Sequence, residues 1–258
     1  MKIRILGCSG GIGRIDSHDL RTTSMLVDHD TLVDCGTGVG DLSIAELAQI
    51  DHVFITHAHL DHIACLPLLI DTVGDMRKKP LIVHATEATL DVLRKHIFNW
   101  AIWPDFSEIP SKEAPFLRFE PVRVGECIEL NGRRITPLPA NHTVPAVGYW
   151  LDSGVASLAL SGDTGPCPEF WQAVNAIENL KYLVIETAFP NREKQLAQAS
   201  LHLCPHMLAT ELGNLHRYAE IFITHLKPGQ SELTMREILA AIHEFRPQML
   251  QHNQVLTF

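Results

Sequence analysis

The stretch FITHAHLDH, from Phe54 to His62, constrains the fold more than any other part of this sequence. An apolar run typical of a buried strand ends in Thr-His, and three more potential metal ligands follow at once. The i, i+2 spacing of His57 and His59 allows both rings to lie on one side of an extended segment. Imidazole and carboxylate groups at this density are typical of a metal site. The sequence therefore predicts a metal site just beyond the end of a strand.

The letters FITH return as Phe222 to His225, again at the end of an apolar run. Three other strand-like runs are also followed by an imidazole or a carboxylate. The five side chains in this position are those of His57, His142, Asp163, Glu186 and His225. Such groups collect at strand ends because the sheet is rigid there and the loop beyond it is open. We expect the two FITH strands to bring two histidines to one pocket from opposite halves of a pseudo-symmetric sandwich.

Short apolar runs alternate with helical patterns, and no low-complexity linker separates them. We therefore expect one domain of mixed strands and helices over residues 1–258. The expected strands cover 2–6, 24–28, 31–38, 51–57, 81–85, 133–140, 157–162, 182–188 and 220–226. The expected helices cover 66–79, 86–100, 167–180 and 233–245. The stretch 102–121, rich in proline, aromatic and acidic residues, reads as an irregular insert.

Charge and hydropathy exclude several classes of protein. The formal net charge is −9, and the only basic cluster covers residues 77–79, whereas proteins that grip long nucleic acids present a basic patch. A small anion is still compatible with a metal site. No run reaches the roughly 18 apolar residues that span a bilayer. The start MKIRILG has no long apolar segment with a cleavage site, so we expect a cytoplasmic protein that binds no membrane.

The ligand types point to imidazole and carboxylate rather than thiolate. Six cysteines stand apart without a CxxC pair, which favours buried free thiols. The candidate ligands are His57, His59, Asp61, His62, His142, Asp163 and His225. Zinc takes four ligands, or three and a water, so this set suits two ions if one carboxylate bridges them. Zinc fits these ligands, as do manganese and iron.

These residues resemble a known family. The motifs THAHLDH, NHT before GYWL, SGDTG and THLKP occur in the order found in the metallo-β-lactamase-fold hydrolases, over most of the chain. Within that superfamily the chain is most similar to the class II 3′,5′-cyclic-nucleotide phosphodiesterases, and it is similar to ribonuclease Z. The closer cues are THAHLDHIACLPLL, WPDF at 103–106, IETAF at 185–189 and HLKP at 225–228. Cys65 and Cys204 depart from the glycine and threonine of the family pattern.

The resemblance implies a four-layered αββα sandwich in the α/β class, built from two similar halves. It implies that His57, His59 and His142 bind one divalent ion, that Asp61, His62 and His225 bind a second, and that Asp163 bridges them. The two ions would share a hydroxide whose pKa they lower toward neutrality. Their residual positive charge would attract a phosphodiester anion.

The resemblance also suggests a proton donor. In ribonuclease Z-like enzymes a glutamate at a strand end holds a histidine that protonates the leaving oxygen, and Glu186 and His202 occupy similar places here. An alkoxide leaves poorly without such a donor. The alternative for this pair is a hydrogen bond that only orients a metal ligand. With Asp61, these two are the expected catalytic residues. Asp34 is expected to order the metal loop by hydrogen bonding, with an ordinary turn residue as the alternative.

Two further stretches bear on the substrate. The aromatic residues Trp100, Trp103 and Phe106 either stack on a base or, as the stronger alternative, pack a satellite core. The glycine-rich stretch 7–13 lacks the lysine and hydroxyl residue of a phosphate-binding loop, so we expect a tight turn near the site.

We therefore expect a metal-dependent phosphodiesterase that hydrolyses cyclic AMP or cyclic GMP. The alternatives are ribonuclease Z-like RNA 3′-processing, hydrolysis of another ester, and, from a different class, a metal sensor without turnover. No glycine- and lysine-rich arm of the kind that grips tRNA is evident. The expected partners are a small anionic phosphodiester and, for the oligomer, a second copy of the chain; no long nucleic acid is expected.

Overall fold

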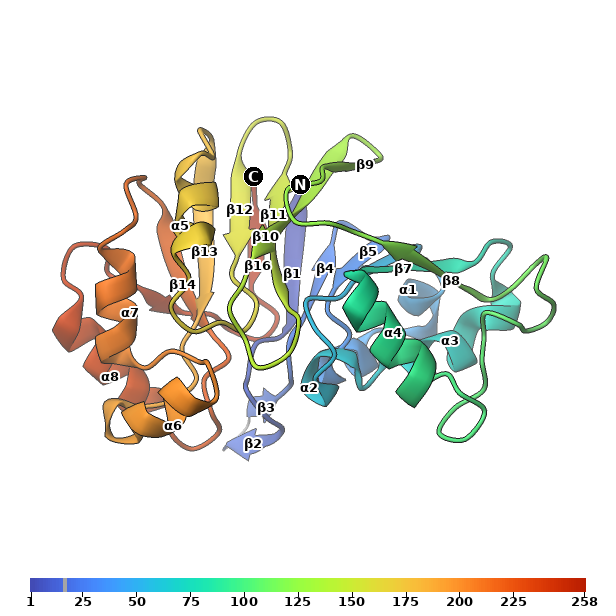
Figure 1. Ribbon diagram of the computed structural model, residues 1–258, viewed down its shortest axis with the longest axis horizontal. Helices are drawn as coiled ribbons and strands as arrows, with labels where there is room; N and C mark the ends of the chain where they lie inside the picture. The colour runs from blue at the N-terminus through green and yellow to red at the C-terminus, as the bar shows by residue number, and fades with distance from the viewer. Residues whose placement is uncertain (16–17) are drawn as a thin grey trace.

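Two sheets pack face to face and carry helices on their outer sides (Figure 1). The computed structural model describes residues 1–15 and 18–258. The first sheet has the strand order β16-β1-β4-β5-β6-β7-β8 and the second the order β15-β14-β13-β12-β11-β10-β9. This arrangement confirms the four-layered αββα sandwich.

The first half of the chain builds the first sheet and its helices. Its strands are β1 (Lys2–Gly7), β4 (Ser24–Val27), β5 (Thr31–Val33), β6 (His52–Phe54), β7 (Leu81–Ala85) and β8 (Leu117–Pro121), completed by β16 (Val255–Thr257) from the end of the chain. Its helices are η1 (Thr37–Asp41), α1 (Ile44–Leu47), α2 (Leu60–Ile63), α3 (Leu66–Val73), η2 (Gly74–Met76) and α4 (Glu87–His96). Strands β2 (Gly13–Ile15) and β3 (His18–Leu20) pair antiparallel in a separate two-stranded sheet.

The second half builds the second sheet. Its strands are β9 (Ile128–Leu130), β10 (Arg133–Pro139), β11 (Val147–Asp152), β12 (Ser157–Leu160), β13 (Leu180–Glu186), β14 (Glu220–Thr224) and β15 (Gln248–Met249). Its helices are α5 (Pro168–Asn175), η3 (Asn191–Glu193), α6 (Lys194–Ala199), α7 (Pro205–Leu212) and α8 (Ser231–Ala241). Helices α1, α3 and α4 lie on one side of the molecule and α5 to α8 on the other (Figure 1).

Three apolar clusters separate the four layers. One lies between the first sheet and its helices, and another between the second sheet and its helices. The third lies between the sheets, where Phe54 of β6 packs edge-on against Tyr149 of β11 at 5.6 Å between ring centres. Strands buried on both faces read as near-continuous apolar runs rather than alternating ones. This is why β13 and β14 could be recognised from the sequence.

The pairing of the strands places their ends at one edge of the molecule. Strands β5 to β8 are parallel, as are β12 to β15, with helices in the crossovers. The carboxyl ends of parallel strands meet at a common edge, where α/β proteins bind their ligands. Residues just beyond β5, β6, β12, β13 and β14 are therefore brought together there.

Some expected elements end earlier or differ in kind. The helix expected over 66–79 ends at Val73, and the one expected over 86–100 ends at His96. The irregular insert expected over 102–121 is wrong at its end, because 117–121 forms the edge strand β8, parallel to β7. A proline is tolerated at that edge, since no further strand needs its missing N–H.

Two expectations from composition can be compared with the structure. All six cysteines are free thiols, as expected, but the expected burial holds for only three of them: Cys8 and Cys65 are half-buried and Cys127 is exposed. Among the described residues, no helix combines the length and the apolar character needed to cross a membrane.

Candidate metal centre

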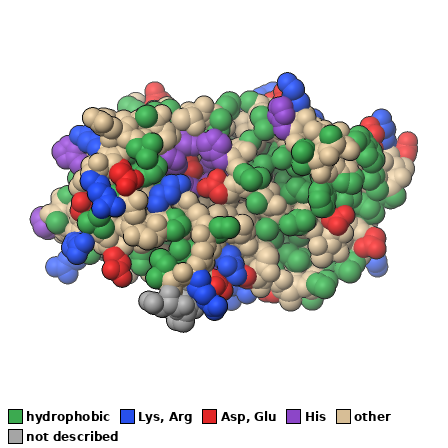
Figure 2. All heavy atoms as spheres, turned by 90° about the horizontal axis from the view of Figure 1, so that it is seen from below, with side chains coloured by type: hydrophobic (Ala, Val, Ile, Leu, Met, Phe, Trp, Pro, Cys, Tyr) green, Lys and Arg blue, Asp and Glu red, His purple; other side chains and the backbone are tan. Residues whose placement is uncertain are grey.

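Histidine and acidic side chains gather at the edge where the parallel strands end. Figure 2 shows this group near the middle of the face seen from below, beside basic side chains. The structure brings together all seven expected ligands, in two clusters. Their roles as ligands remain predictions.

The first cluster consists of His57, His59 and His142, whose ligand atoms lie within 4.8 Å of one another. Nδ1 of His59 and Nε2 of His142 are 3.2 Å apart. The other nitrogen of His142, Nδ1, donates to the carbonyl oxygen of Leu201 at 3.1 Å. That bond leaves the lone pair of Nε2 directed into the cluster, which is the usual arrangement of a ligating histidine.

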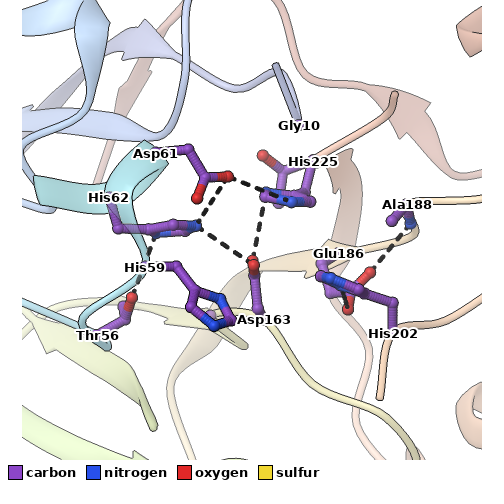
Figure 3. A network of polar contacts seen from close by, with 12 residues as sticks. Gly10, Thr56, His59, Asp61, His62, Asp163, Glu186, Ala188, His202 and His225 are labelled. Atoms are coloured by element: carbon purple, nitrogen blue, oxygen red, sulfur yellow. Dashed lines mark hydrogen bonds and ion pairs between the residues drawn. The ribbon is translucent and has the colours of Figure 1, made fainter. Parts of the chain in front are cut away.

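The second cluster consists of Asp61, His62, Asp163 and His225, again within 4.8 Å (Figure 3). Helix α2 carries Asp61 and His62, and the ends of β12 and β14 supply the other two. Nε2 of His62 lies 3.7 Å from Oδ2 of Asp61, and Nε2 of His225 lies 3.8 Å from the same oxygen.

Asp163 lies between the two clusters. Its Oδ2 is 3.7 Å from Nε2 of His57 and 3.3 Å from Nε2 of His62. Its Oδ1 is 3.3 Å from Nδ1 of His225. A single buried carboxylate thus faces imidazoles of both clusters, as a bridging ligand must.

The chemistry of these groups fits metal ions. Nε2 of His57, Nε2 of His62 and Nδ1 of His225 are buried and have no hydrogen-bond partner among the described residues, although buried polar atoms normally have one. Burial lowers the pKa of His57 well below its usual value and that of His225 to about 3. Both rings are therefore neutral, and neutral imidazole is the form that binds a metal.

His62 shows where positive charge is favoured. Burial lowers its pKa, but the carboxylates of Asp163 and Asp34 outweigh burial and raise the pKa well above the usual value. The pocket between these carboxylates thus stabilises a cation, which is a second reason to place metal ions there.

Asp34, at the end of β5, orders the metal loop as expected. Its Oδ2 accepts from Nδ1 of His62 at 2.7 Å, and its Oδ1 accepts from the backbone N–H of Thr56 at 2.8 Å. The Thr56 hydroxyl donates to the same carboxylate and lies 3.0 Å from Nδ1 of His57. One buried carboxylate therefore orients the rings of two candidate ligands, His62 directly and His57 through the Thr56 hydroxyl. No pattern in the sequence had indicated the part played by Thr56.

Replacing Asp34 with asparagine is expected to weaken metal binding by about 10–100-fold, the usual cost of losing a carboxylate behind a ligand. Asparagine tolerates the left-handed backbone of this residue (φ 57°), so the change removes charge and leaves the turn intact. Competition with a chromophoric chelator measures the affinity. Asp71→Asn, at an exposed position of α3, is the control. Equal affinities in the two variants would show that Asp34 is only a turn residue.

Glu186 and His202 form a buried pair beside the clusters (Figure 3). Nδ1 of His202 donates to Oε1 of Glu186 at 2.8 Å. The backbone N–H groups of Thr164 and Ala188 donate to the same carboxylate at 3.1 and 3.0 Å. Burial lowers the pKa of His202, but Glu186 raises it more, and the net pKa lies above the usual value. A protonated His202 with a free Nε2 suits the expected proton donor. His202 also falls within 4.8 Å of His142 and Asp163, which is close enough to bind an ion.

Lys227 was not singled out from the sequence, although it lies in the HLKP motif. Its Nζ donates to the carbonyl oxygen of Gly10 at 3.0 Å and lies 5.7 Å from the centre of the Phe189 ring. The Phe189 ring in turn meets the His202 ring at 5.7 Å. Among the described residues, none forms an ion pair with this lysine, so its charge is available to an anion at the site.

The glycine-rich stretch lies beside the candidate ligand His225, near the site as expected, but it forms a bend and an isolated β-bridge between Ser9 and Leu226 rather than a tight turn. The backbone N–H of His225 donates to the carbonyl oxygen of Cys8 at 2.8 Å, and that of Gly10 donates to Leu226 at 3.0 Å. A Cβ on Gly10 would lie 2.6 Å from the carbonyl oxygen of His225, so only glycine fits. His225 itself has a left-handed backbone conformation (φ 63°).

The aromatic residues of 100–106 do not line the site. Trp103 and Phe106 pack against the core between the first sheet and its helices, and Trp100 is exposed. The alternative of a satellite core is therefore the better description of this segment.

Comparisons with known proteins agree with the fold. A family model described as a beta-lactamase superfamily domain matches residues 29–250. A probable 3′,5′-cyclic-nucleotide phosphodiesterase from Yersinia pestis is 30% identical over 207 residues, 70% of this chain and 58% of that protein. A ribonuclease Z from Mycobacterium bovis is 28% identical over 257 residues, 90% of this chain and 89% of that protein.

Among solved structures, unliganded yeast PDE1 superimposes with a TM-score of 0.82 at 20% identity, over 100% of this chain and 99% of that one. The similarity in structure shows the fold. The chain spans less than two thirds of the length of the curated cyclic-nucleotide phosphodiesterases that it matches, 54 to 62%.

Proposed function

The chain belongs to the beta-lactamase superfamily, and from this premise we propose that it is a metal-dependent phosphodiesterase that hydrolyses 3′,5′-cyclic nucleotides. The observation that carries the proposal is the pair of ligand clusters around Asp163, with the Glu186–His202 pair beside them. The names of relatives from Yersinia pestis, Saccharomyces cerevisiae and Aliivibrio fischeri support the choice of substrate.

The ligand set is proposed to hold two divalent ions, zinc by the preference of its ligands, with manganese or iron as alternatives. When bound, such ions supply an activated water at neutral pH and neutralise the phosphoryl oxygens. The residues of the chain provide the remaining functions. Asp34 and the Leu201 carbonyl orient the imidazoles, and Lys227 adds positive charge for the anion.

His202 is the proposed proton donor. Glu186 holds its Nδ1, which fixes the ring and leaves Nε2 to donate a proton to the departing sugar oxygen. The four donors around the Glu186 carboxylate include three backbone N–H groups, which hold it in place. In this proposal Glu186 orients the His202 ring, and His202 protonates the leaving group.

Ribonuclease Z-like RNA processing is the second candidate. The observation in its favour is coverage, because the Mycobacterium bovis ribonuclease Z matches nearly all of both chains. The charge of the chain weighs against it, since a net −9 gives little electrostatic attraction for tRNA.

The two candidates differ in how salt should affect them. Cyclic AMP or cyclic GMP should be hydrolysed by the metal-loaded protein, and the rate should fall by less than about threefold between 50 and 200 mM salt, as for a single phosphate contact. The affinity for a tRNA bound through 6–10 phosphates would instead fall by roughly 10³–10⁵-fold over the same range of salt concentration. Precursor tRNA should be cut poorly or not at all. Efficient, salt-sensitive tRNA cleavage without cyclic-nucleotide turnover would instead establish the ribonuclease function.

A further inference from the structure

A hollow of about 480 Å³ adjoins the metal centre at His142. It is lined by the loop 140–147, by Thr86 and Ala88 at the start of α4, and by Val124. Its volume lies within the range of small-molecule sites, which are mostly apolar with a few polar groups. None of the residues that line it is a lysine, arginine, aspartate or glutamate.

The loop 140–147 is fixed to the metal centre at both ends. Near its start, the backbone N–H of Asn141 donates to the hydroxyl of Thr164 at 2.9 Å, beside Asp163, and the backbone N–H of Gly165 donates back to Asn141 at 2.8 Å. At its end, the backbone N–H of Val147 donates to the carbonyl oxygen of Thr56 at 3.0 Å, beside His57. The wall of the hollow is therefore hydrogen-bonded at one end to the residues that follow Asp163 and at the other end to the residue that precedes His57.

Part of the lining is exposed and is not covered by any of the residues that the structure describes. The Val124 side chain is 52% exposed, and Ala88 and Pro145 are exposed too. A smaller hollow of about 150 Å³ lies elsewhere, but charged residues line it and its Arg4 is already paired with Glu46 at 2.6 Å. Only the larger hollow is continuous with a metal ligand.

We propose that this hollow receives the uncharged organic group of the substrate, the nucleoside of a mononucleotide, while the phosphate lies at the metal centre. This inference rests on the proposed function and specifies its substrate. A polyanionic substrate that extended from the metal centre into this hollow would find no lysine or arginine among the lining residues. A neutral sugar and base would instead bury the exposed apolar side chains.

The test fills the hollow from its exposed rim. Val124→Phe and Ala88→Phe enlarge exposed side chains, so both variants should fold. Val155→Phe makes the same change at a position that is 85% exposed in the turn between β11 and β12, outside the hollow, and is the matched control. The substrates are two diesters with the same leaving group, thymidine 5′-p-nitrophenyl phosphate and methyl p-nitrophenyl phosphate. Calorimetric binding of AMP and of inorganic phosphate to the metal-loaded protein gives a readout that needs no turnover.

Each filling variant should raise KM for the thymidine ester by about tenfold, since steric changes in such pockets alter discrimination by 10-fold or more. KM for the methyl ester should stay within about twofold of its value in the unsubstituted protein, because this ester has no nucleoside to clash with the added ring. AMP should bind the unmodified protein more tightly than phosphate does, and the filling variants should lose that advantage while Val155→Phe keeps it. Equal effects on both esters, or an unchanged preference for AMP, would overturn the inference. If neither ester nor cyclic AMP is hydrolysed but the AMP preference depends on Val124, the proposed function fails and the binding site stands.

Discussion

Asp163→Ala is expected to release both metal ions. Asp163 is the carboxylate that faces imidazoles of both clusters, at 3.7 Å from His57 of the first and 3.3 Å from His62 of the second. Removing one member of a buried charge pair costs roughly 3–5 kcal/mol. Because each 1.4 kcal/mol is tenfold, metal affinity should fall by about 10²–10⁴-fold. Phosphodiester hydrolysis should be lost with the ions.

Elemental analysis after gel filtration in metal-supplemented buffer measures this loss, with an expected stoichiometry of two ions per chain before the substitution. Asp61→Ala is the matched control, because Asp61 contacts only the second cluster and should loosen one ion. One ion or fewer in the unsubstituted protein would refute the two-ion site. Full metal content in Asp163→Ala would show that this carboxylate does not bridge.

His202→Ala is expected to keep the ions and to lose the proton donor. For cyclic AMP, whose leaving group is a sugar alkoxide, kcat should fall by roughly 10²–10⁴-fold, the usual contribution of a general acid. For bis-p-nitrophenyl phosphate the loss should be much smaller, because nitrophenolate leaves without a proton. Steady-state rates on the two substrates, with metal content measured on the same samples, give the comparison.

His206→Ala, at an exposed position of α7, is the control and should match the unsubstituted protein. Equal losses on both substrates would mean that His202 positions the substrate rather than protonating it. A loss of metal would mean that His202 is a ligand, which its distance from His142 and Asp163 allows.

The layered fold could be predicted because local apolar runs mark its strands and because short sequence motifs identify its family. The runs around Phe54 and Phe222 are apolar on both faces, and the chain delivers a histidine after each. Elements of weaker pattern escaped prediction. Strand β8 is short and contains two charged residues, Arg118 and Glu120, so it became visible only through its pairing with β7.

The candidate ligands could be predicted for the same reason, since each follows a strand or lies within HAHLDH. The remaining parts of the site depend on contacts between distant segments. The carbonyl of Leu201 reaches His142, 59 positions away, and Gly10 lies against Lys227, 217 positions away. Nothing local distinguishes such residues. The packing of Trp103 against the core likewise depends on tertiary structure. It leaves the ring unavailable to stack on a base, which the sequence alone had left open.

The candidate ligands are divided between the two sheets. His57, at the end of β6, belongs to the first sheet, whereas Asp163 and His225, at the ends of β12 and β14, belong to the second. Ions bound at this seam would act as a noncovalent crosslink, and their binding free energy would add to that of sheet packing. The hydroxyl of Tyr149 in the second sheet already donates to the carbonyl of Ile55, two residues before His57, at 2.9 Å. The packing between the sheets thus reaches to within two residues of a candidate ligand, and a change in that packing would alter the geometry offered to any ions bound at the seam.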